Sequence, residues 1–493
     1  MHDLERVRLD AENFCSDLNK EWFMNLAGLK DEMDLSTIYD KYSHLFTKGL
    51  ILQVKYNRMK STGEPERRLR YLQQLLTDQH LKMVVKNLTE TAQTMQMKEK
   101  VKANEEEIPF RFAAVKIINE PNRKKRSTLY KARNKVIDKI NVVLKERMQK
   151  LHEASKDLGY RNYMTLFKDI HNIEFQEVEK IMQSFIRRTE SLYTQRMDEV
   201  LQNKIGVKLE DAEKHDVAFL FRAKEYDRYF KKENVVDTLE RTLTNMGIHL
   251  QKQKNIHLDT DERPKKSPRA FSIGIKIPED VKLVLMPKGG HDDYATILHE
   301  AGHCEHFGCV EPNLAFEYKW SGDNSVTECF AFLLEYLTTD ENWLRQYINI
   351  NEIKQYLNFQ YLYKLYFLRR YGAKLSYELM LHTKGLEGMD ETYKETLERA
   401  LKFKHPKNHY LMDLDDGFYC AWYLRAWIFE SQLRALFKER FGEEWFNNAD
   451  AGGFLKQLWS KGQKYDVVEL AKRLGFSGLD IEPLVTSIQK NLH

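Results

Sequence analysis

The chain has 493 residues, of which 42% are hydrophobic and 31% charged, which is enough sequence for one large core or for two packed lobes. The 78 basic and 74 acidic residues leave a formal net charge of +4, so composition gives no argument for nucleic acid as a partner. The densest basic run, Arg123 to Arg126, is typical of a solvated helix face.

The N-terminal sequence MHDLERVRLDAENFC lacks the apolar stretch of a signal peptide, and no window approaches about 18 uninterrupted apolar residues. Five cysteines, an odd and sparse number in a long chain, argue against a disulfide framework. We therefore expect a cytoplasmic protein without a membrane span.

Helical periodicity dominates the first half of the chain. Apolar residues recur at spacings of three and four with charges between them, which predicts amphipathic helices. These helices are expected over residues 3–32, 36–60, 66–104, 126–157, 175–203 and 209–246. Near Gly159 one helix is expected to end before the next begins.

Residues 255–288 break this pattern. Prolines and turn residues separate short runs such as FSIGIKI and VKLVLM, which predicts two or three short strands. The strands end at Gly289–Gly290, and a helix is expected from about Asp292. Further helices are expected over residues 325–340, 350–383, 388–403, 417–440 and 451–473.

The fold class that follows is mostly α, with one small β-sheet beside the helix that begins near Asp292. No linker between separate domains is visible in the sequence. We expect residues 1–493 to form one unit, divisible into a helical lobe of residues 1–200 and a second lobe of residues 201–493.

The strongest motif is His299-Glu300-Ala301-Gly302-His303, an H-E-x-x-H sequence. Positions i and i+4 share one helix face, so both imidazoles can bind one Zn²⁺ while Glu300 reaches the attacking water. Tyr294, Ile297 and Leu298 give this helix apolar, buried neighbours, which favours a metal site over two surface histidines.

A catalytic zinc site needs a third protein ligand and keeps one position open. Glu328 is the best candidate because 24 residues separate it from His303 and its neighbours are apolar. Glu335, seven residues later, remains the competing ligand. Glu305 and His306 share the motif helix and are expected to lie in the outer shell or to face solvent.

Several segments together resemble the thimet oligopeptidase and oligoendopeptidase F family of zinc metallopeptidases, which are gluzincins. They are DDYATILHEAGHCEHF, the spacing to Glu328, DTDERPKKSPRAF before the zinc helix, and ASKDLGYRNYMTL from Ala154. The resemblance spans roughly residues 120–480. It implies one zinc per chain, a deep cleft between two helical lobes, and hydrolysis of peptide bonds in short unstructured oligopeptides.

The resemblance also extends to MDLDDGFYCAWYLRAWIFE, where Tyr419 and Tyr423 match a tyrosine pair that faces the zinc across the cleft. A tyrosine hydroxyl can donate to the oxyanion, with Tyr423 the first candidate and Tyr419 the second. The chain departs from the family pattern at Ala426, where a third tyrosine is common. The histidine that assists the tyrosines is matched only by His409, which lies further upstream.

An extended peptide can add itself to an exposed strand edge. Residues 268–277, PRAFSIGIKI, are expected to provide this edge, with Ala270 and Phe271 contacting substrate. The expected partners are therefore short peptides, with no nucleic acid and no membrane, and the oligomeric state stays open.

Three alternatives remain. A metallocarboxypeptidase on the same scaffold needs a cation for the terminal carboxylate of its substrate, for which Arg425 or Arg269 could serve. A non-catalytic binding protein could retain the metal, although the general base Glu300 argues against it. A helical scaffold without metal is the third.

Overall fold

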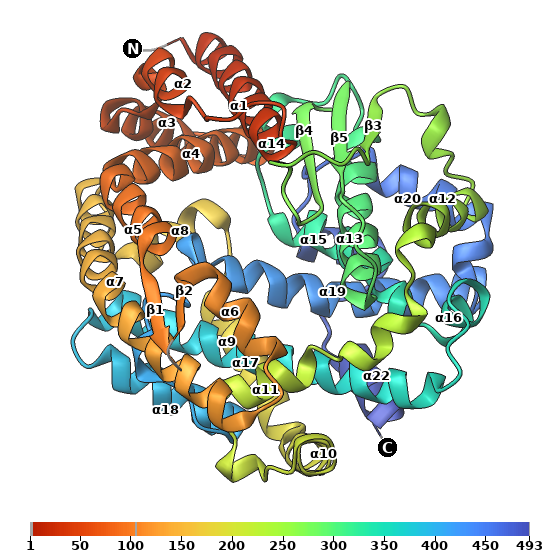
Figure 1. Cartoon of the computed structure of the whole chain (residues 1–493). Coiled ribbons are helices and arrows are strands. Elements are labelled where there is room, and N and C mark those ends of the chain that lie inside the picture. Colours follow the sequence, from red (N-terminus) through yellow and green to blue (C-terminus); the bar gives the residue numbers. More distant parts are fainter. Residues whose placement is uncertain (1–2, 104–105, 493) are drawn as a thin grey trace. The chain divides into compact units, whose positions relative to one another are not determined.

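The computed structural model describes residues 3–103 and 106–492 of the chain. Within these residues 72% of the chain is helical, in 22 α-helices, and the strands form two small sheets (Figure 1). The mostly α expectation is confirmed, whereas the sequence predicts only one of the two sheets.

The chain divides into two compact units, each made of separated segments. Unit 1 comprises Met1–Thr77, Glu225–Leu357 and Arg425–Thr486, and unit 2 comprises Asp78–Lys224, Asn358–Leu424 and Ser487–His493. Each unit combines residues from both sides of position 200, so a single cut there describes neither unit. Four helices contribute to both units: α4 (Gly63–Val84), α17 (Ile353–Lys384), α19 (Tyr419–Phe441) and α22 (Glu482–Leu492).

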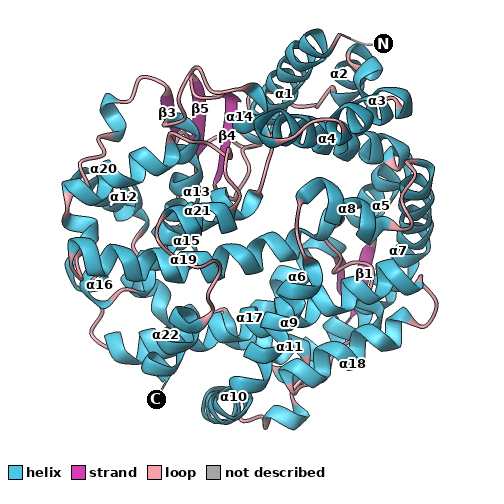
Figure 2. Cartoon of the chain, turned by 180° about the vertical axis from the view of Figure 1, so that it is seen from behind, coloured by secondary structure: helices cyan, strands magenta, loops and turns pink. Residues whose placement is uncertain are grey.

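Unit 1 contains the predicted strand region. Its three strands, β3 (Ile256–Asp259), β4 (Phe271–Lys276) and β5 (Asp280–Val284), form a sheet in the order β3-β5-β4. β5 pairs in parallel with β3 and antiparallel with β4, so β4 is an edge strand. Figures 1 and 2 show this sheet next to α13 (His291–Gly308).

The other helices that lie wholly in unit 1 are α1 (Leu4–Leu26), α2 (Leu35–Lys41), α3 (Lys48–Met59), α12 (Val235–Asn245), α14 (Phe316–Trp320), α15 (Asn324–Glu335), α16 (Glu341–Tyr347), α20 (Ala449–Trp459) and α21 (Val467–Arg473). The helices that lie wholly in unit 2 are α5 (Lys86–Lys98), α6 (Phe110–Asn119), α7 (Arg123–Asp157), α8 (Tyr163–His171), α9 (Phe175–Arg188), α10 (Glu190–Ile205), α11 (Lys214–Phe221) and α18 (Met389–Leu401).

Several predicted helices are divided in the structure. The range 36–60 contains α2 and α3, the range 175–203 contains α9 and α10, and the range 209–246 contains α11 and α12. At Thr189, between α9 and α10, the break carries no glycine or proline. The spacing of apolar residues indicates which face of a helix is buried. It does not indicate where the chain changes direction when no glycine or proline marks the break.

The second sheet, in unit 2, corrects the helix predicted over residues 66–104. Residue 104 lies outside the described residues, but Lys100–Ala103 forms strand β1, paired antiparallel with β2 (Glu106–Pro109). Burial alternates along β1, with Val101 and Ala103 buried, which is the period of a strand. Four residues are too few for this alternation to outweigh the helical pattern that precedes them.

The basic run at the start of α7 does not form a purely solvated face. Arg126 is 1% exposed and its Nη2 donates to Asp216 Oδ1 at 2.7 Å, while Arg123 Nη2 lies 3.0 Å from Asp216 Oδ2. Two of the four basic residues therefore anchor α7 to α11.

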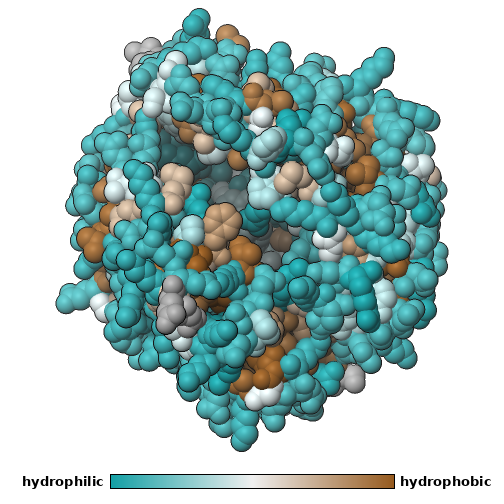
Figure 3. Space-filling view, in the orientation of Figure 1, coloured by the Kyte–Doolittle hydropathy of each residue, from teal (hydrophilic) through white to brown (hydrophobic). Residues whose placement is uncertain are grey.

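The face of the molecule in Figure 3 is largely hydrophilic, with hydrophobic residues scattered over it. Among the described residues, no helix combines the length and the hydropathy that a membrane crossing requires.

Candidate metal centre

Helix α13 begins where the sequence predicts, one residue before Asp292. Gly290 precedes the helix with φ 94°, a conformation that favours glycine. Asp293 Oδ2 accepts hydrogen bonds from the backbone N–H groups of Lys288 and Gly289, at 2.6 and 2.9 Å. Its negative charge also suits the positive end of the helix dipole. This turn fixes where the motif helix starts against the sheet.

Three side-chain atoms of unit 1 converge on one point. Glu328 Oε2 lies 3.5 Å from His299 Nε2 and 3.6 Å from His303 Nε2, and the potential ligand atoms of the three residues all lie within 4.8 Å of one another. Tetrahedral zinc with bonds of 2.0–2.2 Å places its ligand atoms roughly 3.4 Å apart. The three predicted ligands therefore come together at a spacing that fits zinc.

Gly302, inside the motif, allows this convergence. A Cβ at this position would lie 2.6 Å from Ala331 Cα and 2.7 Å from Phe330 O, both on α15. The two helices thus approach so closely that only glycine fits between them, and Glu328 is carried on the same helix one turn before Ala331. The sequence offers Gly302 as one of two unspecified motif positions and does not reveal this role.

The outer nitrogen of each histidine has its own partner. His299 Nδ1 lies 2.7 Å from Glu335 Oε2, and His303 Nδ1 lies 2.7 Å from Thr327 Oγ1. Both oxygens can accept from an Nδ1–H, which leaves each Nε2 for a metal. The geometry favours Glu328 over Glu335 as the third ligand, because Glu335 contacts the outer nitrogen. The contact of Thr327 with His303 was not predicted from the sequence, although Thr327 directly precedes Glu328.

Glu300 is held by the edge strand. Its Oε2 accepts a hydrogen bond from the backbone N–H of Ser272 at 2.8 Å, and burial raises the pKa of Glu300 above its ordinary value. The bond joins the predicted general base to β4. Sequence reasoning singled out Ala270 and Phe271 on this segment but not Ser272.

Mutual electrostatics keep the centre charged. Burial acts to raise the pKa of Glu328, but the two histidines outweigh it and hold that pKa well below its ordinary value. Burial acts to lower the pKa of His299, but Glu328 and Glu335 outweigh it and hold that pKa well above its ordinary value. Glu328 is therefore ionised, as a metal ligand must be.

Strand β4 begins at Phe271, so Ala270 immediately precedes it and both lie near the Glu300 contact. At Gly274 the carbonyl accepts a hydrogen bond from Asn19 Nδ2 of α1 at 2.8 Å. One part of the outer edge is thus covered by α1, and the substrate contact expected at Ala270 and Phe271 stays a prediction.

The predicted tyrosines belong to unit 2. The rings of Tyr419 and Tyr423 lie 5.0 Å apart at the start of α19, and Tyr423 packs edge-on against Tyr371 at 5.7 Å. Both tyrosines are half-buried. Their expected sharing of one helix face is confirmed, and their participation in chemistry stays a prediction.

The remaining predicted substrate residues have different environments. His409 in unit 2 is buried, with Nδ1 3.1 Å from Lys214 Nζ and Nε2 3.0 Å from Asn134 Oδ1. Arg425 in unit 1 is also buried, and its Nη1 lies 2.9 Å from Asp323. These contacts favour structural roles for both residues, and their contact with substrate stays a prediction.

For Glu305 and His306, one of the two expected environments is excluded. Glu305 and His306 do not face solvent: they are 1% and 0% exposed. Glu305 Oε2 accepts from Gln253 Nε2 at 2.8 Å, and the ring of His306 packs edge-on against Phe330 at 5.0 Å. The C-terminal half of α13 is enclosed on more sides than its sequence indicates, because helices from distant segments cover it.

A second group of potential metal ligands lies in unit 2. Glu378, Asp415 and Cys420 place their ligand atoms within 4.8 Å of one another. The ammonium of Lys374 lies 2.8 Å from Asp415 and 3.8 Å from Glu378. It supplies the positive charge that these carboxylates need, so this group is explained as an ion-pair cluster.

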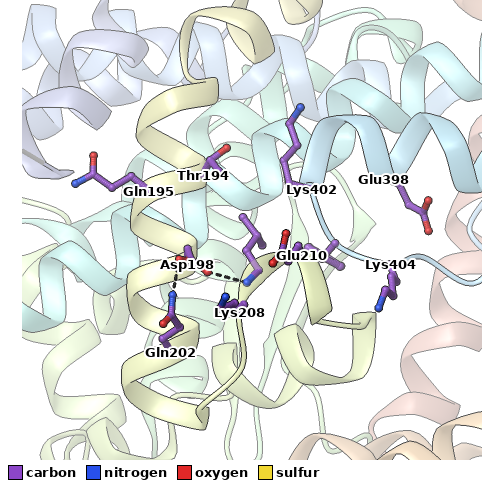
Figure 4. A pocket seen from close by; sticks show the side chains of 11 residues that line it. Thr194, Gln195, Asp198, Gln202, Lys208, Glu210, Glu398, Lys402 and Lys404 are labelled. Atoms are coloured by element: carbon purple, nitrogen blue, oxygen red, sulfur yellow. Dashed lines mark hydrogen bonds between the residues drawn. The ribbon is translucent and has the colours of Figure 1, made fainter.

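Unit 2 also has a pocket of about 800 Å³ (Figure 4). It is lined by Thr194, Gln195, Asp198, Gln202, Lys208, Leu209, Glu210, Glu398, Lys402, Phe403 and Lys404. Lys402 pairs with Glu190 at 2.9 Å and Lys404 lies 3.9 Å from Asp211, and in Figure 4 these lysines point apart. The lining carries no convergent set of reactive groups.

No protein-family model matches the chain, and no curated protein matches it with significance. The resemblance to the thimet oligopeptidase and oligoendopeptidase F family therefore stays an expectation that rests on the motifs.

Proposed function

We propose that the chain is a zinc metallopeptidase that hydrolyses peptide bonds in short, unstructured oligopeptides. The observation that carries the proposal is the convergence of His299, His303 and Glu328 at zinc-ligand spacing, with Glu300 adjacent. A purely structural metal site has no need of a neighbouring carboxylate, whereas a hydrolytic site requires a base.

His299, His303 and Glu328 would hold one zinc per chain, and the partners of the two outer nitrogens support this role. When bound, zinc would supply Lewis acidity to the substrate carbonyl and to the attacking water. The outer contacts hold the imidazoles in one orientation, so the histidine side chains lose little conformational entropy when the ion binds.

Glu300 would act as the base in this mechanism. It takes a proton from the attacking water and passes it to the leaving amine. The Ser272 N–H fixes one carboxylate oxygen at 2.8 Å and leaves the other for this transfer. The oxyanion then needs a hydrogen-bond donor, for which we propose the hydroxyl of Tyr423, with Tyr419 as the second candidate.

An edge strand that also positions the base suggests how substrate is aligned. An extended peptide can pair with the backbone groups near Ala270 and Phe271, which gives affinity with little sequence preference. Folded proteins present few extended free edges, so unstructured peptides are the expected substrates. The proposed cellular location is the cytoplasm.

A metallocarboxypeptidase is the alternative within the same chemistry. It has less support because Arg425, one of its two candidate cations, is buried and paired with Asp323. Arg269 is exposed and remains a candidate. Peptides with amidated C-termini separate the two activities, since a carboxypeptidase does not cleave them.

The testing experiment is Glu300→Gln, which keeps the size of the side chain and removes the base. Zinc content, measured by elemental analysis, should stay near one per chain while cleavage of a quenched fluorescent peptide falls by roughly 10²–10⁴. The matched control is Glu279→Gln, a change at an exposed glutamate on the turn before β5, which should leave both values unchanged. Absence of zinc from the unmodified chain, or normal turnover in Glu300→Gln, would refute the proposal.

A further inference from the structure

A group of basic side chains in unit 2 includes none of the residues that would hold the metal or act as the base. It comprises Lys214 at the start of α11, Arg133 on α7, Arg370 on α17, and His405 and His409 on the segment that follows α18. We name these five residues the cationic cluster.

Three carboxylates near the cluster have partners of their own, and one of them, Glu398, accepts from the backbone N–H of His405 at 2.9 Å. Asp413 Oδ1 pairs with Arg370 Nη2, and Asp413 Oδ2 accepts from the hydroxyl of Tyr393 at 2.8 Å. Asp415 pairs with Lys374 at 2.8 Å. Arg370 and Lys374 are therefore compensated, and no carboxylate among them is left for Lys214 or Arg133.

Lys214 has an unusual partner. Its Nζ lies 3.1 Å from His409 Nδ1, while His409 Nε2 lies 3.0 Å from Asn134 Oδ1. The amide oxygen can only accept, so the His409 ring donates through Nε2 and accepts through Nδ1. The ammonium of Lys214 donates one of its three N–H groups to His409. Among the described residues it forms no ion pair.

Arg133 is likewise uncompensated. Its guanidinium lies 4.4 Å from the centre of the Phe110 ring, and its enclosed Nε has no hydrogen-bond partner among the described residues. Arg126, two turns earlier on the same helix, differs because Asp216 pairs with it at 2.7 Å. The fold thus supplies a carboxylate to the buried Arg126 and none to the partly buried Arg133.

One chain of contacts connects the two cations: the ammonium of Lys214 contacts His409, His409 contacts Asn134, and Asn134 follows Arg133 on α7. Burial, helped by the charges of Arg370 and Arg133 and opposed by the charge of Asp413, lowers the pKa of Lys214 to about 8. Partly buried cations that form no ion pair are unfavourable, and an anion that accepts from both side chains would remove that cost. An ammonium beside a guanidinium is a combination that binds carboxylates and phosphates.

We propose that Lys214 and Arg133 form a binding site for a small oxyanion, either a carboxylate or a phosphate. The site lies within unit 2, and it does not depend on the proposed peptidase activity.

The test measures thermal unfolding of the full chain at fixed ionic strength in chloride, acetate and inorganic phosphate. An anion that binds the folded protein raises the melting temperature in a saturable manner. A rise in acetate alone identifies a carboxylate site, and a rise in phosphate alone or in both identifies a site for the phosphate class. Equal melting temperatures in all three salts would overturn the proposal.

Lys214→Met assigns the effect to the cluster. It should raise the melting temperature in chloride, because a partly buried cation without an ion pair is removed, and it should weaken anion binding at least tenfold by calorimetric titration. A residue that served only the hydrogen bond to His409 would lower the melting temperature when replaced. Lys404→Met is the matched control, since that side chain is 61% exposed on a neighbouring segment, and it should respond like the unmodified chain.

Arg133→Gln provides a second variant if Lys214→Met does not fold. It should also lose at least tenfold in anion affinity. Unchanged anion binding in either variant would place the anion elsewhere and would contradict the proposal.

Discussion

The metal centre of unit 1 and the cationic cluster of unit 2 are both groups of buried and partly buried titratable side chains, but they are built with opposite charge. In the metal centre, Glu335 and Thr327 occupy the outer nitrogens of the two histidines, and the inner nitrogens converge on the Glu328 carboxylate. In the cationic cluster, Asp413 forms an ion pair with Arg370 and accepts a hydrogen bond from Tyr393. The ammonium of Lys214 forms no ion pair among the described residues. The first arrangement suits a cation and the second an anion.

The difference teaches which observation identifies a site in an enclosed cluster. Burial alone does not, because Arg126 and Lys374 are as enclosed as many site residues and are matched by Asp216 and Asp415. What separates the two sites from such ion pairs is the charge that is not matched by an oppositely charged side chain within the protein.

The largest expected effect is at the metal centre. Glu328→Ala removes one of three ligands and should abolish both zinc binding and peptide cleavage, as measured by elemental analysis and by turnover. Glu335→Gln should weaken zinc binding by only about 10–100-fold, because it perturbs an outer contact. If the two variants exchanged these effects, Glu335 would be the ligand.

Tyr423→Phe asks whether unit 2 takes part in the chemistry. If its hydroxyl donates to the oxyanion, kcat should fall by roughly 10²–10³ with KM nearly unchanged and zinc retained. Tyr371→Phe is the control, because Tyr371 packs against the Tyr423 ring and carries no proposed role. An unchanged kcat in Tyr423→Phe would show that Tyr423 serves only in the packing of aromatic rings.

A pH series sharpens the description of the cationic cluster. The pKa of Lys214 is lowered to about 8 in the folded chain, from an ordinary value of 10.5. Below pH 8 the folded state carries the full cost of the charge, and between pH 8 and 10.5 the unfolded state binds more protons, so stability rises with pH. Relative to Lys214→Met, the unmodified chain should therefore gain at most about 3 kcal/mol across this window.

Denaturant titrations of both proteins in chloride at pH 7, 9 and 10.5 would measure this gain. The comparison with Lys214→Met cancels the buried tyrosines, whose raised pKa values also affect stability at high pH. A saturating oxyanion should reduce the pH dependence, because it stabilises the charged ammonium. A pH-independent difference between the two proteins would mean that Lys214 titrates normally.

Gly302→Ala gives the smallest expected effect on stability, but it is specific to the metal centre. The new Cβ would meet the backbone of α15 at 2.6–2.7 Å, and moving the helices apart should cost about 1–3 kcal/mol and weaken zinc binding. Gly453→Ala on α20 is the matched control, because nothing lies within 4 Å of its Cβ position. It should be neutral or stabilise by up to about 1 kcal/mol.

The sequence by itself determined the mostly α fold, the strand region before the motif helix, and the three residues that converge at zinc-ligand spacing. These follow from local periodicities and from a five-residue motif whose geometry is internal to one helix. The second sheet and the breaks inside helices such as that at Thr189 did not follow, because neither carries a strong local marker.

The tertiary structure alone decided the partners of these residues. Ser272 holds Glu300, Thr327 and Glu335 hold the histidines, and Gly302 sets the separation of α13 from α15. It also decided that Arg126 has a carboxylate and Arg133 has none, although both are basic residues of one amphipathic helix. Sequence spacing reports which residues share a helix face, whereas the match of one charge to another depends on segments that only folding brings together.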